Sequence, residues 1–130
     1  MKTYCFDTHA LYFWVTGQHV TPQFQEFFDR ELDRNRLWVS SICFWELALL
    51  VKKGRLEMEN IVAWKEQVCQ NSAIPVIDPT ANNMISSTLL PAIHKDPFDR
   101  ILIAQALNHN AVLVTRDTIF TQYSVPTFWM

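Results

Sequence analysis

Short apolar runs alternate along the chain with longer segments whose apolar positions recur every three or four residues. The short runs predict strands over residues 2–6, 36–40, 74–77, 111–115 and 125–127. The longer segments predict helices beginning near Thr8 and over residues 22–35, 41–54, 59–71, 80–89 and 99–109. Strands that alternate with helices favour right-handed crossovers, so we expect an α/β fold with a mainly parallel sheet covered on both faces.

The size and composition of the chain favour one packed domain spanning residues 1–130. Nearly half of the 130 residues are hydrophobic, and no repeat, low-complexity tract or long linker divides them. The net charge of −2 argues against a general electrostatic attraction for nucleic acid, although it leaves room for a local basic rim.

Three features of the sequence favour a cytoplasmic protein that is not bound to a membrane. Cys5, Cys43 and Cys69 are widely spaced, which predicts buried thiols in a reducing compartment and neither a disulfide framework nor a zinc site. Asp7 interrupts what would be the apolar core of a signal peptide. The longest apolar run is too short to span a bilayer.

The stretch "HKDPFDRILIAQAL" contains two aspartates at the start of a predicted helix. Asp96 suits the N-cap, Pro97 the first helical position and Asp99 the third, so Asp96 needs no role beyond starting the helix. Helical spacing aligns Asp99 with the apolar face of the same helix, where a charge requires a partner. This stretch alone leaves helix capping and metal ligation equally open for Asp99.

Glu46 is the only polar residue between Ile42 and Val51, in a segment that is apolar nearly all round. A buried salt bridge or an exposed strip on a mostly buried helix would explain it. Because an uncompensated buried carboxylate is costly, we favour the interpretation that Glu46 faces a cation in a cleft.

Asp7 and Asp117 each come at or just after the end of a predicted strand. Asp78 also leaves a strand, but it precedes Pro79 as a cap would, so position at a strand exit does not by itself identify a functional residue. Parallel strands bring their carboxyl ends to one edge, where Asp7, Glu46, Asp99 and Asp117 could meet. Such a cluster predicts a Mg²⁺ or Mn²⁺ site that activates water for phosphodiester hydrolysis.

Four blocks of the sequence are "FDTHALYFW", "SSICFWELALLVKKGRL", "LPAIHKDPFDRILIAQAL" and "AVLVTRDTIF". In order and spacing they resemble the motifs of PIN-domain proteins, and especially those of the VapC-type toxins of type II toxin–antitoxin modules. The resemblance implies a sheet of about five strands and a Mg²⁺- or Mn²⁺-dependent endoribonuclease whose acidic quartet is Asp7, Glu46, Asp99 and Asp117. Thr115 matches a hydroxyl position near the site. Cys43 departs from the family, in which serine is common before the Trp-Glu pair.

The resemblance also implies partners that composition does not indicate. It implies an RNA substrate, commonly tRNA or ribosomal RNA, a homodimer, and a cognate antitoxin that lays a segment across the active-site groove. Aromatic residues on three helices are candidates for that groove, although a packed core explains such residues more often: Phe13, Trp14, Phe27, Phe28 and Trp64.

Several basic residues near the four blocks could contact RNA phosphates: Lys52, Lys53, Arg55, Lys95, Arg100 and Arg116. Lys52 and Lys53 also suit the end of a helix, where cations complement the dipole. His9 and His94 adjoin the acids, and we expect supporting or structural roles for both.

The competing interpretations fit the sequence less well. A phosphoacceptor receiver domain would need an acidic pair after the first strand and a late lysine, and a haloacid-dehalogenase-like phosphatase would need an aspartate where His9 stands. A catalytically silent PIN domain that binds RNA or a protein partner is the remaining alternative, which the intact quartet disfavours.

Overall fold

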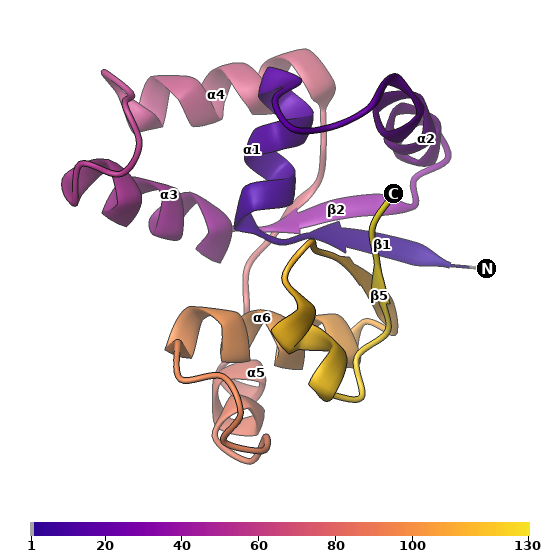
Figure 1. Cartoon of the computed structure of the whole chain (residues 1–130), viewed down its shortest axis with the longest axis vertical. Helices are drawn as coiled ribbons and strands as arrows, with labels where there is room; N and C mark the ends of the chain where they lie inside the picture. Colours follow the sequence, from indigo (N-terminus) through magenta and orange to yellow (C-terminus); the bar gives the residue numbers. More distant parts are fainter. Residues whose placement is uncertain (1) are drawn as a thin grey trace.

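The structure, a computed structural model, describes residues 2–130 and is an α/β fold (Figure 1). The strands are β1 (Thr3–Phe6), β2 (Leu37–Ser40), β3 (Val76–Ile77), β4 (Ala111–Val114) and β5 (Thr127–Phe128). The helices are α1 (Thr8–Thr16), α2 (Pro22–Asp33), α3 (Ile42–Lys52), α4 (Ile61–Ser72), α5 (Ala81–Ser87) and α6 (Pro97–Asn108), followed by a 3₁₀ helix, η1 (Thr118–Gln122).

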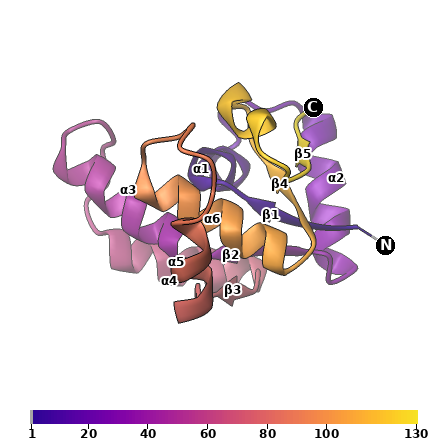
Figure 2. The ribbon, with the colours of Figure 1, turned by 90° about the horizontal axis from the view of Figure 1, so that it is seen from below.

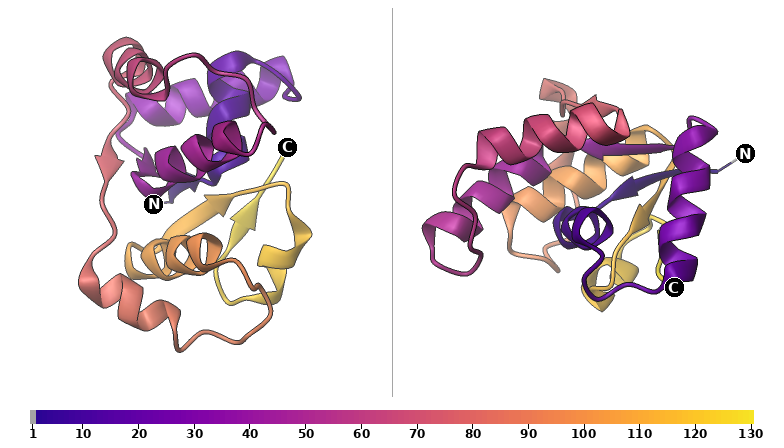
Figure 3. Two further views of the ribbon diagram at one scale, coloured as in Figure 1. Left: turned by 90° about the vertical axis from the view of Figure 1, so that its left-hand side faces the viewer. Right: turned by 90° about the horizontal axis from the view of Figure 1, so that it is seen from above.

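All strands pair in parallel, in the order β3-β2-β1-β4-β5, which confirms the predicted five-stranded parallel sheet. Helices α1 to α4 cover one face, and α5 and α6 cover the other (Figure 1). The view from below has α5 and α6 in front of the sheet (Figure 2), whereas the view from above has α1, α2 and α4 in front (Figure 3). The central strands are therefore buried on both faces, and their side chains are apolar throughout β1 and β4 except at Thr3.

The two edge strands are shorter than predicted, and a proline precedes each of them. Pro75 and Pro126 have no N–H to contribute to a ladder, although the carbonyl of each accepts a hydrogen bond from the neighbouring strand. The strand expected at residues 74–77 therefore begins at Val76, and the strand expected at residues 125–127 is Thr127–Phe128. The 3₁₀ helix η1 was not predicted.

The core lies between the sheet and its two helical layers. Phe6, Phe24 and Phe28 are fully buried and pack against one another, with ring centroids 4.7 to 6.3 Å apart. Trp129 packs against Phe24 with ring centroids 4.8 Å apart. Among residues 2–130, every helix is too short or too polar to serve as a membrane span.

The three cysteines carry free thiols, as predicted. Cys5 and Cys43 are buried, whereas Cys69 is only half-buried. Burial raises the pKa of the Cys5 and Cys43 thiols, so both behave as small apolar side chains in the core.

Candidate metal site at the carboxyl edge of the sheet

The sequence-predicted acids gather where the strands end and α1, α3 and α6 begin. Asp7 lies directly between β1 and α1, and Asp117 follows β4 and precedes η1. Glu46 lies in the first half of α3 and Asp99 in the first turn of α6. These two helices cover opposite faces of the sheet and come into contact with each other at this edge.

Glu46, Asp96 and Asp99 form the tightest group of carboxylates in the described part of the chain. One oxygen from each residue lies within 4.8 Å of the others, and all three residues are partly buried. Glu46 also accepts a hydrogen bond from the hydroxyl of Thr8, which holds its carboxylate at the start of α1. Clustered carboxylate oxygens are the donors that Mg²⁺ and Mn²⁺ prefer, so these residues fit a hard divalent cation.

The electrostatics of Asp99 reflect this crowding. Burial raises the pKa of its carboxyl group to about 8, and the nearby carboxylates of Glu46, Asp96, Asp7 and Asp117 contribute in the same direction. The negative charge of Asp99 is therefore unfavourable in the metal-free protein, because neighbouring like charges and desolvation both oppose ionisation. A bound cation would reverse that balance.

Asp7 is buried and lies outside the group of three. Its Oδ1 accepts a hydrogen bond of 2.7 Å from the amide of Ala10, so Asp7 is the N-cap of α1. Burial raises the pKa of Asp7, while the hydroxyl of Thr115 and the amide of Ala10 act in the opposite direction. Thr115 thus lies beside the carboxylate of Asp7. The family resemblance places a hydroxyl near the site at this position.

His94 connects Asp99 to Asp117. Its Nε2 lies 2.9 Å from Asp99 Oδ2 and 4.0 Å from Asp117 Oδ2. The amide of Asp96 donates to Nδ1 of His94 at 3.3 Å, which assigns the proton of the neutral imidazole to Nε2. His94 therefore donates to Asp99 through Nε2, a supporting contact of the kind that orients metal-binding side chains.

Asp117 is the most exposed of the predicted acids, with 47% of its side chain accessible. Its Oδ1 accepts from the amide of Ile119 at 3.0 Å and so begins η1. Like Asp7, it lies near Asp99 but outside the group whose oxygens approach within 4.8 Å.

Asp96 lies both at the start of α6 and beside the other carboxylates of the site. The predicted N-cap is confirmed, because its Oδ1 accepts from the amide of Phe98 at 3.0 Å. Its carboxylate also belongs to the group with Glu46 and Asp99, a placement that was not predicted from the sequence. The N-cap and the third position of a helix both lie in its first turn, so the spacing of Asp96 and Asp99 was the signal in the sequence that their carboxylates lie close together.

The guanidinium of Arg100 is engaged with the main chain, which disfavours the contact with RNA phosphates considered for it. Its guanidinium donates to four main-chain carbonyls, those of Ser87, Leu90, Pro91 and His94, at 2.9 to 3.3 Å. Together these bonds clamp the segment between α5 and α6. Arg100 therefore fixes the loop that carries His94.

The hydroxyl of Tyr123, which directly follows η1, also holds the loop between α5 and α6. It accepts from the amide of His94 at 2.7 Å and donates to the carbonyl of Pro91 at 3.0 Å. Arg116, by contrast, is exposed and lies over the rings of Phe13 and Trp129, at 4.9 and 5.9 Å from their centroids. Arg116 is therefore the more exposed of the two arginines.

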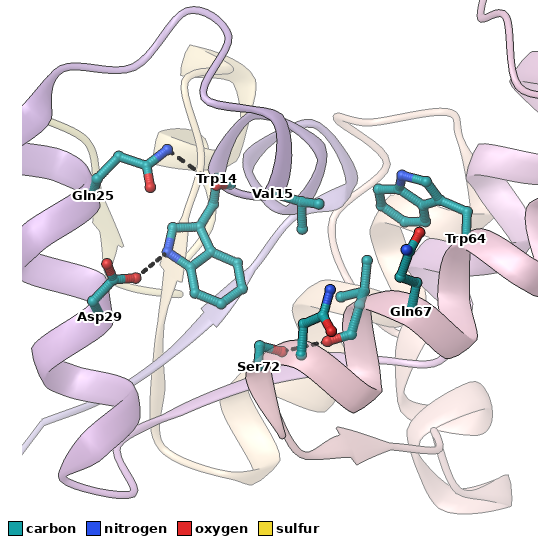
Figure 4. A pocket seen from close by; sticks show the side chains of 9 residues that line it. Trp14, Val15, Gln25, Asp29, Trp64, Gln67 and Ser72 are labelled. Atoms are coloured by element: carbon teal, nitrogen blue, oxygen red, sulfur yellow. Dashed lines mark hydrogen bonds between the residues drawn. The ribbon is translucent and has the colours of Figure 1, made fainter.

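The aromatic residues considered for an antitoxin groove are buried in the core or pack against it. Phe28 is fully buried, and Phe27 packs against the core. Trp14 and Trp64 line a hollow of about 260 Å³ between α1, α2 and α4 (Figure 4). The indole of Trp14 donates to Asp29 at 3.1 Å, and the side-chain amide of Gln25 donates to the Trp14 carbonyl at 3.0 Å, so this hollow has ordered polar walls.

These features define the class of protein: a parallel α/β domain with a carboxylate cluster at the carboxyl edge of its sheet. The PIN domain family matches residues 4–126, and the chain therefore belongs to that family.

Individual relatives cover nearly the whole chain. The chain is 26% identical to "Ribonuclease VapC22" of Mycobacterium tuberculosis, across 99% of this chain and 100% of the relative. VapBC2 from Rickettsia felis, solved with a DNA fragment from its promoter, superposes with a TM-score of 0.75 at 18% identity, covering 98% of this chain and 99% of that one. DNA-bound VapBC from Salmonella typhimurium gives 0.71 at 19% identity, with 98% of each chain covered.

Proposed function

We propose that the protein is a metal-dependent endoribonuclease that acts as the toxin of a type II toxin–antitoxin pair. The carboxylate group of Glu46, Asp96 and Asp99, within a domain of the PIN family, is the observation that carries this proposal. The relative named as a ribonuclease and the VapBC complexes support it. A cytoplasmic location would give such an enzyme access to its RNA.

The quartet Asp7, Glu46, Asp99 and Asp117 would hold a Mg²⁺ or Mn²⁺ ion in this proposal. Asp96, whose carboxylate lies within reach of Glu46 and Asp99, would add a further oxygen to the site. The ion would supply Lewis-acid chemistry: it lowers the pKa of water and stabilises charge on the phosphate. His94 would hold the Asp99 carboxylate in place, because its Nε2–H donates to Oδ2.

Purified protein incubated with RNA and Mg²⁺ or Mn²⁺ tests the nuclease. We expect cuts that leave 5′-phosphate and 3′-hydroxyl ends, loss of cutting in EDTA, and loss of cutting on Asp7→Asn or Asp99→Asn. Asp78→Asn is the matched control, because Asp78 also follows a strand and lies outside the carboxylate group. Cleavage by Asp99→Asn at the parental rate would refute the proposed site.

A silent PIN domain that only binds RNA or a protein partner is the second candidate. Titration of metal into the cleavage assay separates the two: the silent domain binds RNA without producing new ends at any metal concentration. Sequencing RNA ends after the protein is induced in cells tests tRNA and ribosomal RNA as substrates. Co-expression of the cognate antitoxin should suppress the new ends.

The proposal also includes a homodimer. Helix α5 and the residues after it expose apolar side chains, with Met84 47%, Ile85 62% and Leu89 83% accessible. Contiguous exposed apolar side chains mark interaction surfaces. If the dimer uses this surface, Ile85→Glu should give a monomer in size-exclusion chromatography, whereas Val62→Glu on α4 should not change the assembly.

A further inference from the structure

One side of the 3₁₀ helix η1 faces His94, the histidine beside the carboxylates. Asp117 directly precedes η1, Phe120 lies in the middle of it and Tyr123 directly follows it, so these residues are three positions apart. A 3₁₀ helix has three residues per turn, and side chains with this spacing lie on the same side of it. The three side chains therefore share one neighbour, and that neighbour is His94.

Each of the three side chains makes a different contact with His94. Oδ2 of Asp117 lies 4.0 Å from Nε2 of the imidazole. The buried ring of Phe120 packs against the imidazole with ring centroids 5.4 Å apart. The hydroxyl of Tyr123 accepts a hydrogen bond of 2.7 Å from the His94 amide. This short segment thus contacts both the ring and the backbone of His94.

The main chain of His94 is held at both of its polar groups. The hydroxyl of Tyr123 accepts from the amide, and the guanidinium of Arg100 donates to the carbonyl at 3.3 Å. Arg100 belongs to α6, so its bonds tie the loop to the helix that follows it. Tyr123 belongs to the segment after β4, which begins with Asp117. The bond from Tyr123 therefore joins the loop to the Asp117 side of the site.

The imidazole of His94 links this backbone position to Asp99. Its Nδ1 accepts from the amide of Asp96 at 3.3 Å, and its Nε2 donates to Asp99 Oδ2 at 2.9 Å. Contacts at both nitrogens and with the Phe120 ring define the side-chain torsions once the backbone is fixed. A displacement of the His94 backbone therefore displaces the donor that orients Asp99.

Closing the loop between α5 and α6 is a simpler role for Tyr123, and the contacts of the loop disfavour it. Tyr123 is 7% exposed, and a buried hydroxyl requires hydrogen-bond partners wherever it lies. Arg100 already donates to four carbonyls of the loop, including that of Pro91, to which Tyr123 also donates. The bond that Arg100 does not duplicate is the one to the His94 amide.

We propose that Tyr123 is a positioning residue of the carboxylate site. Through His94 it fixes the Asp99 carboxylate, on α6, relative to Asp117, before η1. The two acids come from separate segments of the chain, and a binding site requires its groups to be held near one geometry by supporting hydrogen bonds. The inference rests on the proposed function for what the acids bind, whereas the position of His94 is a property of the chain itself.

Tyr123→Phe tests the proposal, because it removes the hydroxyl and keeps the ring. Tyr4→Phe is the matched control: Tyr4 is also 7% exposed, but it lies near the start of β1, whereas the carboxylates lie beyond the end of that strand. Both substitutions are made in the parent and in the His94→Ala variant. Titration calorimetry gives the Mn²⁺ affinity of each protein, and urea unfolding in EDTA gives its stability.

We expect Tyr123→Phe to weaken Mn²⁺ binding about three- to ten-fold, less than the ~10–100-fold typical of residues that contact a metal ligand directly. In the His94→Ala background the same substitution should change Mn²⁺ affinity by less than about two-fold, because the imidazole that transmits its effect is missing. The urea midpoint should fall equally in both backgrounds, since the bonds of Tyr123 to the main chain do not involve the imidazole. Tyr4→Phe should leave the Mn²⁺ affinity at its parental value.

A second measurement needs no metal. The imidazole protons of His94 lie beside the Phe120 ring, whose ring current shifts their NMR signals from those of a free histidine. In the metal-free protein at a fixed pH, Tyr123→Phe should move these signals towards the free-histidine values or broaden them, and Tyr4→Phe should leave them in place.

The assignment is overturned if Tyr123→Phe leaves the imidazole signals unchanged, or if it weakens Mn²⁺ binding to the same extent with and without the His94 imidazole. An unchanged Mn²⁺ affinity, in a parent that binds Mn²⁺, would overturn it as well. The proposed function fails separately: if the parent neither binds Mn²⁺ nor cuts RNA, that function is wrong, and the imidazole signals still decide the role of Tyr123.

Discussion

Replacing Asp99 with asparagine should make the metal-free protein more stable while abolishing metal-dependent cleavage. The pKa of Asp99 is raised from an ordinary 3.8 to about 8, with burial as the leading cause and the carboxylate of Glu46 as the next. Between these two values the folded chain binds more protons than the unfolded chain. The free energy of unfolding therefore decreases as the pH rises through this window, and the loss is complete above about pH 8.

The size of the effect follows from the pKa of Asp99. Each pH unit in the window costs about 1.4 kcal/mol, so the upper limit at pH 7 is about 4 kcal/mol. The Asp99 side chain is 16% exposed, and the donor of His94 lies 2.9 Å away. Solvent screening, that hydrogen bond and the dipole of α6 all reduce the penalty, and we expect a net gain of ~1–3 kcal/mol for Asp99→Asn.

Urea unfolding in EDTA measures this gain. Asp99→Asn should unfold at a higher urea midpoint than the parent at about pH 8, and the difference should shrink towards about pH 5. Asp78→Asn should change the free energy of unfolding by no more than about 0.5 kcal/mol at either pH. The electrostatic reasoning is refuted if Asp99→Asn is no more stable than the parent at the higher pH, or if its gain does not depend on pH.

Variants at three further positions test individual contacts. Asp96→Ser keeps an N-cap but removes the carboxylate, whereas Asp96→Ala removes both. Titration calorimetry should therefore give the same loss of Mn²⁺ affinity for the two variants. Only Asp96→Ala should also lower the free energy of unfolding, by about 1 kcal/mol. His94→Ala should weaken Mn²⁺ binding and His94→Gln should partly restore it through a donated N–H; equal affinities would exclude an orienting role. Arg100→Ala should lower the free energy of unfolding by ~1–3 kcal/mol and leave RNA affinity unchanged.

The sequence predicted most of the fold because the signals for its elements are local. Periodicity located the central strands and the six helices, and Asp96 followed by Pro97 marked the start of α6 correctly. The edge strands were placed less well, because only two residues of each pair with a neighbour and proline interrupts the pattern. The 3₁₀ helix was missed, since one turn begun by Asp117 carries no periodic signal.

The sequence predicted that the candidate site lies at the carboxyl edge of the sheet. It did not predict which carboxylate oxygens lie close together there. Parallel strands bring their carboxyl ends together, so Asp7 and Asp117 could be placed near each other from the chain alone. Which carboxylates come within reach of one ion depends on how α3 and α6, from opposite faces of the sheet, meet at that edge. This contact brings Glu46 to Asp96 as well as to Asp99, and no local pattern encodes it.

Capping and metal ligation are compatible roles for these aspartates, although the sequence presents them as alternatives. Asp7, Asp96 and Asp117 each accept a helical amide hydrogen through Oδ1 alone, at 2.7 to 3.0 Å. Each cap therefore fixes the carboxylate at a helix N-terminus and leaves Oδ2 without a main-chain hydrogen bond. The positive end of each helix offsets part of the repulsion among the acids, so the backbone that orients them also lowers the cost of gathering them. Asparagine caps a helix as well as aspartate does, which is why Asp→Asn substitutions separate the two roles at these positions.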